Sequence, residues 1–106
     1  MQYQVEHNPS ENNFVCKLKD IHAVLSYSRK EDALALERLF IPEIYEDSAV
    51  PRQLVKTALK YCQNHNLKAV PLAPYIKEEF LPEHPQYESL VKEDPGPAPG
   101  SEFLRL

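Results

Sequence analysis

Hydrophobic and polar residues alternate in short segments along the first part of the chain, as is typical of β-strands. Residues 14–18 and 22–28 are rich in β-branched and aromatic side chains, and residues 33–41 form a third apolar run. Short polar joints separate the segments, at a spacing of about ten residues. This spacing predicts an antiparallel meander, with residues 2–5 as a candidate strand before it. The Leu, Ala and Glu content of residues 33–41 also suits a helix.

The period of the pattern changes near residue 50. Apolar residues from Val50 to Cys62 recur at the spacing of one helix stripe. Pro51 suits a first helical turn, where its missing N–H costs little. Asp47 and Ser48 precede the helix. They are predicted to cap it and to place favourable charge at its positive end. Basic residues line the opposite side of this helix: Arg52, Lys56 and Lys60.

The pattern then predicts a strand over residues 68–73 and a short helix over residues 75–81, stopped by Pro82. A final apolar pair, Leu90-Val91, can dock on the core. A strand–helix–strand unit that ends a meander implies a mixed sheet with a right-handed crossover. The sequence therefore predicts one α/β (α+β) domain over residues 1–92, with a mainly antiparallel sheet, one long crossover helix and a short C-terminal helix.

Composition narrows the class of protein. The chain has 106 residues and a net charge of −4 without a basic block, which argues against nucleic acid as a partner. Cys16 and Cys62 lie far apart and are expected to be buried thiols in a reducing compartment. No cationic leader and no apolar run of about 20 residues is present, so we expect a cytoplasmic protein without membrane contact. The four histidines lack metal-ligand spacing, and no metal is expected.

The tail, residues 93–106, is rich in proline and glycine and holds the only glycines of the chain, Gly96 and Gly100. Its composition disfavours a packed element, and residues 100–103 resemble a cloning-site sequence.

Three sequence segments carry a resemblance to a known family. The helix stretch over residues 54–62 is followed by V-P-L-A-P-Y at residues 70–75 and by H-P-Q-Y at residues 84–87. Over residues 3–92 the chain resembles the minimal single-domain GNAT-like acetyltransferases, as a divergent member. The resemblance implies a GNAT-like fold, acetyl-CoA as cofactor and an unidentified small-molecule or protein amine as acceptor, in a monomer or weak dimer.

The resemblance also implies where the cofactor lies: between residues 33–41 and the strand at residues 68–73, with its pyrophosphate at the helix start. The family has a glycine-rich basic loop there, because a side chain would keep phosphate from the backbone N–H groups. In this chain Asp47 and Ala49 stand at the glycine positions, and Glu46 stands at the basic one. Arg52 and Lys56 can replace part of the lost positive charge. The implied cofactor-binding positions are Asp47, Ser48, Ala49, Val50, Arg52, Lys56 and Ala73.

Two further positions depart from the family. Ala73 stands where the family has a cysteine, and Arg38-Leu39 stands where it has a His-Thr pair. Neither alanine nor a protonated arginine replaces a nucleophile or base, so transfer through an acetyl-cysteine is not expected. Direct transfer needs only a positioned amine and a polarised carbonyl. Candidate catalytic groups are the phenols of Tyr61, Tyr75 and Tyr87 and the imidazole of His84, with Tyr75 and His84 preferred.

The sequence leaves three functional interpretations open. The first is an acetyl-CoA-dependent N-acetyltransferase. The second is a catalytically inactive GNAT-fold binding or interaction module, since the glycines, the cysteine and the histidine are all absent. The third is an unrelated small α/β partner-binding domain, which would lack a separated strand pair before the helix. Acidic residues Glu78, Glu79, Glu83 and Glu88 form a rim that suits an amine substrate or is simply solvated.

Overall fold

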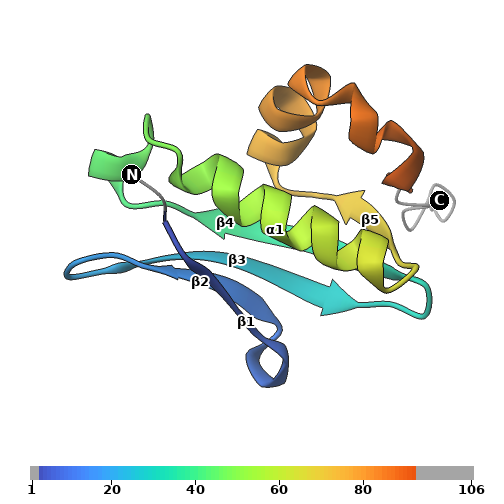
Figure 1. The fold of residues 1–106 in the computed structure, drawn as a ribbon, viewed down its shortest axis with the longest axis horizontal. Coiled ribbons are helices and arrows are strands. Elements are labelled where there is room, and N and C mark those ends of the chain that lie inside the picture. The colour runs from blue at the N-terminus through green and yellow to red at the C-terminus, as the bar shows by residue number, and fades with distance from the viewer. Residues whose placement is uncertain (1–2, 93–106) are drawn as a thin grey trace, which may run out of the picture.

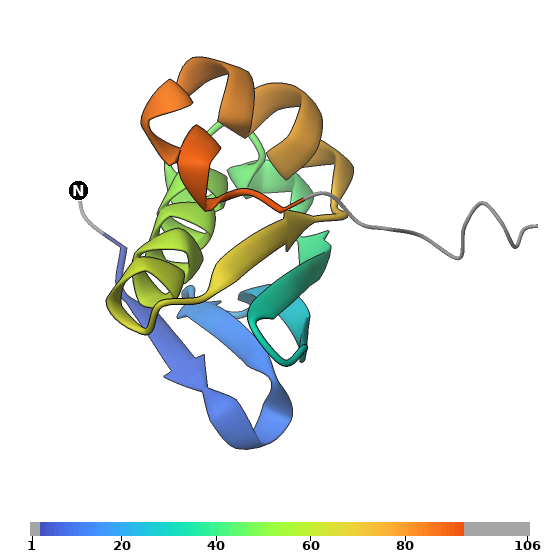
Figure 2. The same ribbon diagram turned by 90° about the vertical axis from the view of Figure 1, so that its right-hand side faces the viewer.

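The chain folds into a five-stranded sheet with one long helix lying across one of its faces (Figures 1 and 2). A computed structural model describes residues 3–92. The strand order is β1-β2-β3-β4-β5; the first four strands are antiparallel neighbours and β5 runs parallel to β4. This confirms the mixed, mainly antiparallel sheet with a crossover helix that the sequence predicted. The main elements are β1 (Val5–Asn8), β2 (Asn13–Lys17), β3 (His22–Arg29), β4 (Ala33–Phe40), α1 (Val50–Asn64) and β5 (Lys68–Pro71).

The N-terminal strand lies further along the chain than the sequence predicted. β1 begins at Val5, which pairs with Cys16, and ends at Asn8, so the expected strand over residues 2–5 is largely wrong. A 3₁₀ turn at Pro9–Glu11 (η1) joins β1 to β2, and Asn12 closes it in the left-handed region at φ 56°. Asparagine tolerates this conformation better than most residues. The position of this turn fixes the register of β1.

Residues 33–41 form a strand, so the helical alternative is wrong. The first four residues of β4, Ala33–Leu36, are all buried, because β3 and β5 flank them and both faces are covered. A strand that is covered on both faces has a continuous run of apolar residues in its sequence, without alternating polar residues. Leu34 and Leu36 join the main core, while Ala33 and Ala35 form a small second cluster with Val70 of β5.

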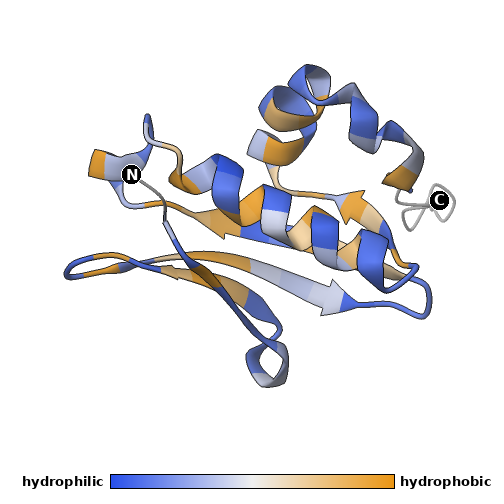
Figure 3. Cartoon of the chain, in the orientation of Figure 1, coloured by the Kyte–Doolittle hydropathy of each residue, from blue (hydrophilic) through white to orange (hydrophobic). Residues whose placement is uncertain are grey.

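Helix α1 buries one stripe against the sheet, as its sequence period predicted. Apolar and polar bands alternate along it in Figure 3. The basic residues Arg52, Lys56 and Lys60 are exposed on its other side. After α1, Asn66 takes a left-handed conformation at φ 56° and the chain turns into β5. The buried residues of the helix are Val50, Pro51, Leu54, Val55, Ala58, Leu59 and Cys62.

The segment after β5 is helical, but not as one helix stopped by Pro82. A π-helical turn, Ile76–Phe80 (η3), continues into a 3₁₀ turn at Leu81–Glu83 (η4), and Pro82 lies inside that second turn. Proline needs no N–H in the first residues of such a turn, so it is accommodated there. A further 3₁₀ helix, Pro85–Leu90 (η5), returns the chain to β5.

The C-terminal apolar pair docks as expected. Leu90 packs against the core, and Val91 forms an isolated parallel bridge with Ala69 of β5. The predicted tail over residues 93–106 lies outside the described residues. Cys16 and Cys62 are free and buried, as predicted. Within residues 3–92 no helix has the length and apolar character needed to cross a membrane.

Candidate functional site

The central feature of the site is the point where β4 and β5 separate. Their parallel pairing runs from Ala33 opposite Lys68 to Leu36 opposite Pro71 and then stops. The next two residues after β5, Leu72 and Ala73, both donate their N–H groups to the carbonyl oxygen of Leu36, each at 3.0 Å. Beyond Leu36 the edge of β4 that faces β5 has no strand partner. We call this gap the β4–β5 opening; it lies between the two strands that the sequence singled out.

A bulge in β4 lies at the start of this opening. Ser26 of β3 faces Arg38, and the next residue, Tyr27, faces Leu36, which leaves Glu37 without a partner in the ladder. Such a bulge turns the side chains that follow it. The carboxylate of Glu37 accepts a hydrogen bond from Ser28 Oγ at 2.6 Å. Glu37 and Arg38 line a hollow together with Ser26 and Leu72. Arg38 does not line the neighbouring cavity at the start of α1.

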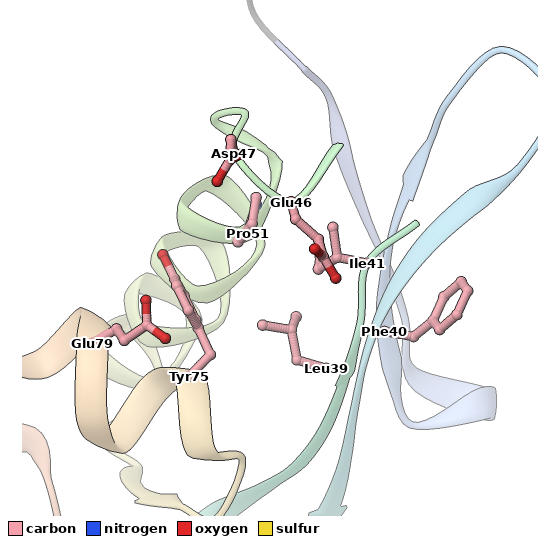
Figure 4. Close-up of a pocket in the computed structure, with 8 residues that line it drawn as sticks. All are labelled: Leu39, Phe40, Ile41, Glu46, Asp47, Pro51, Tyr75 and Glu79. Carbon is pink, nitrogen blue, oxygen red and sulfur yellow. The ribbon is translucent and has the colours of Figure 1, made fainter. Parts of the chain in front are cut away.

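A cavity lies between the end of β4, the start of α1 and the start of η3, and has a volume of about 520 Å³. We call it the β4–α1 cavity. In Figure 4 the carboxylates of Glu46 and Glu79 approach the space around Leu39 from opposite sides, and the phenol of Tyr75 lies beside Glu79. The residues that line the β4–α1 cavity are Leu39, Phe40, Ile41, Glu46, Asp47, Pro51, Tyr75 and Glu79.

The start of α1 satisfies much of its own hydrogen-bonding capacity. Ser48 Oγ accepts a hydrogen bond from the N–H of Val50 at 3.1 Å and donates one to the carbonyl oxygen of Tyr45 at 2.6 Å. Pro51 has no N–H, and the N–H of Gln53 is bonded to the carbonyl oxygen of Ala49 at 2.9 Å. The N–H of Arg52 is therefore the main donor that the first turn can still offer to a ligand.

This helix start does not fit the pyrophosphate that the sequence resemblance implies. Three carboxylates line the cavity beside it (Glu46, Asp47 and Glu79), and no basic side chain does. Like charges about 4 Å apart repel each other by on the order of a few kcal/mol near a protein surface. The capped first turn has too few free N–H groups to offset that repulsion.

The structure brings together only some of the positions that the sequence assigned to the cofactor. Asp47 lines the β4–α1 cavity, whereas the hydroxyl of Ser48 accepts the hydrogen bond from the N–H of Val50. Val50 is fully buried in the core, and Ala73 is also buried, with its N–H on Leu36. Of the remaining positions, Ala49 is partly buried, and Arg52 and Lys56 are exposed on α1.

Tyr75 is the one predicted catalytic candidate that lines the cavity. Burial raises the pKa of its phenol above the usual value, the positive charge of Arg52 lowers it, and the charges of Glu79 and Glu83 raise it further. The phenol is therefore protonated at neutral pH and can give up a proton.

The other aromatic candidates lie away from the cavity lining. His84 stacks on Phe80 with ring centroids 4.0 Å apart, and its Nδ1 is 2.9 Å from the Phe80 carbonyl oxygen. Tyr87 is buried near the same rings. Tyr61 belongs to a cluster with His7 and His65 near the end of α1.

The sequence placed Glu79 in an acidic rim that suits an amine substrate or is simply solvated, and it placed Glu46 at the basic position of the family's loop. Glu79 follows Tyr75 by four residues, which places the two on one helical face and was the available signal. The inward position of Glu46 depends on how residues 41–49 fold around the helix start, and no sequence period encodes that. In the part of the chain that the structure describes, no three His, Cys, Asp or Glu side chains gather as a metal site.

The family model described as GCN5-related N-acetyl-transferase matches residues 13–90, from β2 to the end of η5. A search among curated proteins finds no match. The matched region contains the β4–β5 opening, the bulge in β4 and the β4–α1 cavity, and it covers well over half of the chain. The chain therefore belongs to the GCN5-related N-acetyltransferase family.

Proposed function

We propose that this domain is an N-acetyltransferase that takes an acetyl thioester in the β4–β5 opening and transfers the acetyl group to an amine. Acetyl-CoA is the donor that membership of the family implies. The observation that carries the proposal is the unpaired edge of β4 beyond Leu36, next to a cavity that holds a protonated phenol. The acceptor is a small-molecule or protein amine.

The residues of the opening supply the groups that direct acyl transfer needs. Unpaired backbone N–H groups on β4 after Leu36 can polarise a thioester carbonyl, in the manner of an oxyanion hole. The neutral amine nitrogen attacks the carbonyl carbon and the C–S bond breaks. The sulfur takes a proton and leaves as a thiol, and the nitrogen gives up one proton to water as the amide forms. Tyr75 is the group in the cavity that can donate that proton, because its phenol lies in the lining and is protonated at neutral pH.

A second function is favoured by a specific observation. The positions that carry nucleophilic or basic side chains in the resembling family are occupied by buried Ala73 and outward-lying Arg38, and the helix start is capped and surrounded by carboxylates. These features fit an inactive GNAT-fold domain that binds a partner and has lost CoA binding.

The test is acetyl transfer measured on the product. The full chain is mixed with acetyl-CoA or acetyl-pantetheine and a panel of primary amines, and the acetylated amine is quantified by mass spectrometry. We expect product above the protein-free reaction, with a rate that falls about 10²-fold or more in Tyr75→Phe because the proton donor is lost. Tyr61→Phe is the matched control, since Tyr61 lies outside the cavity, and it should keep the wild-type rate. Absence of acetylated product with both donors would contradict the transferase and favour the binding module.

A further inference from the structure

The acidic lining of the β4–α1 cavity bears directly on which donor the domain takes. Acetyl-CoA joins a neutral pantetheine arm, which carries the thioester, to a nucleotide half with several phosphate charges. The cavity presents carboxylates from two directions, Glu46 and Asp47 from the loop before α1 and Glu79 from η3. A phosphate in or beside this cavity would meet these three negative charges together.

The rest of the cavity suits a neutral ligand. Leu39 and Ile41 at the end of β4, with Pro51 at the start of α1, give it apolar walls. Its volume of about 520 Å³ lies within the usual range of small-molecule pockets, roughly 300–1,000 Å³. A flexible arm with amide groups can pack on such walls and reach the β4–β5 opening beside them.

Positive charge near the cavity does not reverse this preference. Arg52 is close enough to Tyr75 to lower the pKa of its phenol, but its side chain is exposed and does not line the cavity. Lys56 is also exposed, one turn further along α1. Glu46, Asp47 and Glu79 are exposed as well, but they line the cavity, so a ligand in it meets these carboxylates and neither Arg52 nor Lys56.

We propose that Glu46, Asp47 and Glu79 make the domain select a phosphate-free acyl thioester of the pantetheine type over acetyl-CoA. The inference rests on the proposed function, because it assumes that a thioester occupies the β4–β5 opening. It adds that the nucleotide half of CoA weakens binding in this chain. The three carboxylates thus determine donor specificity, and the transferred group and the reaction stay the same.

The test compares binding of two donors that share the thioester arm. Affinities of the full chain for acetyl-pantetheine and acetyl-CoA are measured by calorimetry or NMR titration at about 10 mM and about 150 mM salt. We expect acetyl-pantetheine to bind at least about tenfold more tightly at low salt, because the phosphates are repelled. Added salt should strengthen acetyl-CoA binding and leave acetyl-pantetheine binding unchanged. This salt response is a readout that does not depend on catalysis.

Neutral variants test the residues themselves. In the triple variant Glu46→Gln, Asp47→Asn, Glu79→Gln, the affinity ratio of the two donors should fall toward one and the salt response should disappear. The matched control neutralises three exposed carboxylates outside the cavity, Glu31→Gln, Glu78→Gln and Glu88→Gln, and should keep the wild-type ratio. Circular dichroism melting confirms that both variants fold.

The outcomes separate this inference from the proposed function. Tighter binding of acetyl-CoA than of acetyl-pantetheine at low salt, or an unchanged ratio in the triple variant, would overturn the donor preference while leaving acyl transfer intact. Preferential binding of acetyl-pantetheine without any acetylated amine would support the preference and refute the transferase. Binding of neither donor would overturn both.

Discussion

Ser48 ties the loop before α1 to the helix, and its removal gives the sharpest test of the site geometry. Its hydroxyl accepts a hydrogen bond from the N–H of Val50 and donates one to the carbonyl oxygen of Tyr45. Each lost neutral hydrogen bond costs about 0.5–1.5 kcal/mol net. We expect Ser48→Ala to lower the free energy of unfolding by about 1–2 kcal/mol. For a domain of this size each kcal/mol shifts Tm by about 4–8 °C.

The freed N–H of Val50 gains no ligand in exchange, because Val50 is fully buried and does not line the β4–α1 cavity. Urea unfolding followed by far-UV circular dichroism measures the loss of stability.

Asp47→Asn is the control for this experiment, because the sequence predicted both Asp47 and Ser48 as caps. Within residues 3–92, Asp47 makes no side-chain hydrogen bond to the first turn, and only its charge acts on the helix dipole. Its neutralisation should cost a few tenths of a kcal/mol. The stabilising role of the Ser48 hydroxyl would be refuted if Ser48→Ala were as stable as the wild type. It would also be refuted if Asp47→Asn lost more stability than Ser48→Ala.

Two further predictions concern the core beside α1. Burial, and to a smaller extent the charge of His65, lower the pKa of His7, which stacks on Phe14 and is hydrogen-bonded to the hydroxyl of Tyr27. His7 therefore binds a proton more readily in the unfolded chain than in the folded one. The stability that neutral His7 contributes is present above pH about 6.5 and is lost as the pH falls through its lower folded pKa. Urea unfolding between pH 8 and pH 5, roughly one unit or more to each side of the ordinary histidine pKa, should show this loss of stability. The pH dependence should be smaller in His7→Gln. Equal pH dependence in the two proteins would contradict the role of His7. Burial also raises the pKa of Cys62 to about 11, and its side chain is fully buried. The reaction of its thiol with an aromatic disulfide reagent should therefore follow the unfolding rate, and fast labelling of the folded protein would show that α1 opens locally.

The sequence predicted the framework of the fold because each part of it rests on a local period. The helix stripe from Val50 to Cys62 buries the positions that its spacing singled out. The meander followed from short apolar runs and polar joints, and the crossover followed from the strand after α1. In β4 the period was ambiguous, since a strand covered on both faces shows no alternation.

The parts that the sequence did not predict depend on contacts between distant segments. The start of β1 is set by its pairing of Val5 with Cys16 and by the turn at Asn12. The cavity joins Glu46 to Glu79, which lie more than thirty residues apart and are brought together by the crossover. The hydrogen bonds of Ser48 depend on the short turn at Glu43–Tyr45 (η2), which brings the Tyr45 carbonyl oxygen to the hydroxyl.

The shared carbonyl of Leu36 has a consequence for how this domain can change. Two successive N–H groups, from Leu72 and Ala73, meet one oxygen, so the strands diverge through main-chain bonding that every residue except proline can make at these positions. The chemistry beside the opening can therefore be erased or rebuilt without loss of the scaffold. An engineered loop with glycines at Asp47 and Ala49 and a basic residue at Glu46 would be grafted onto a frame already shaped to receive it.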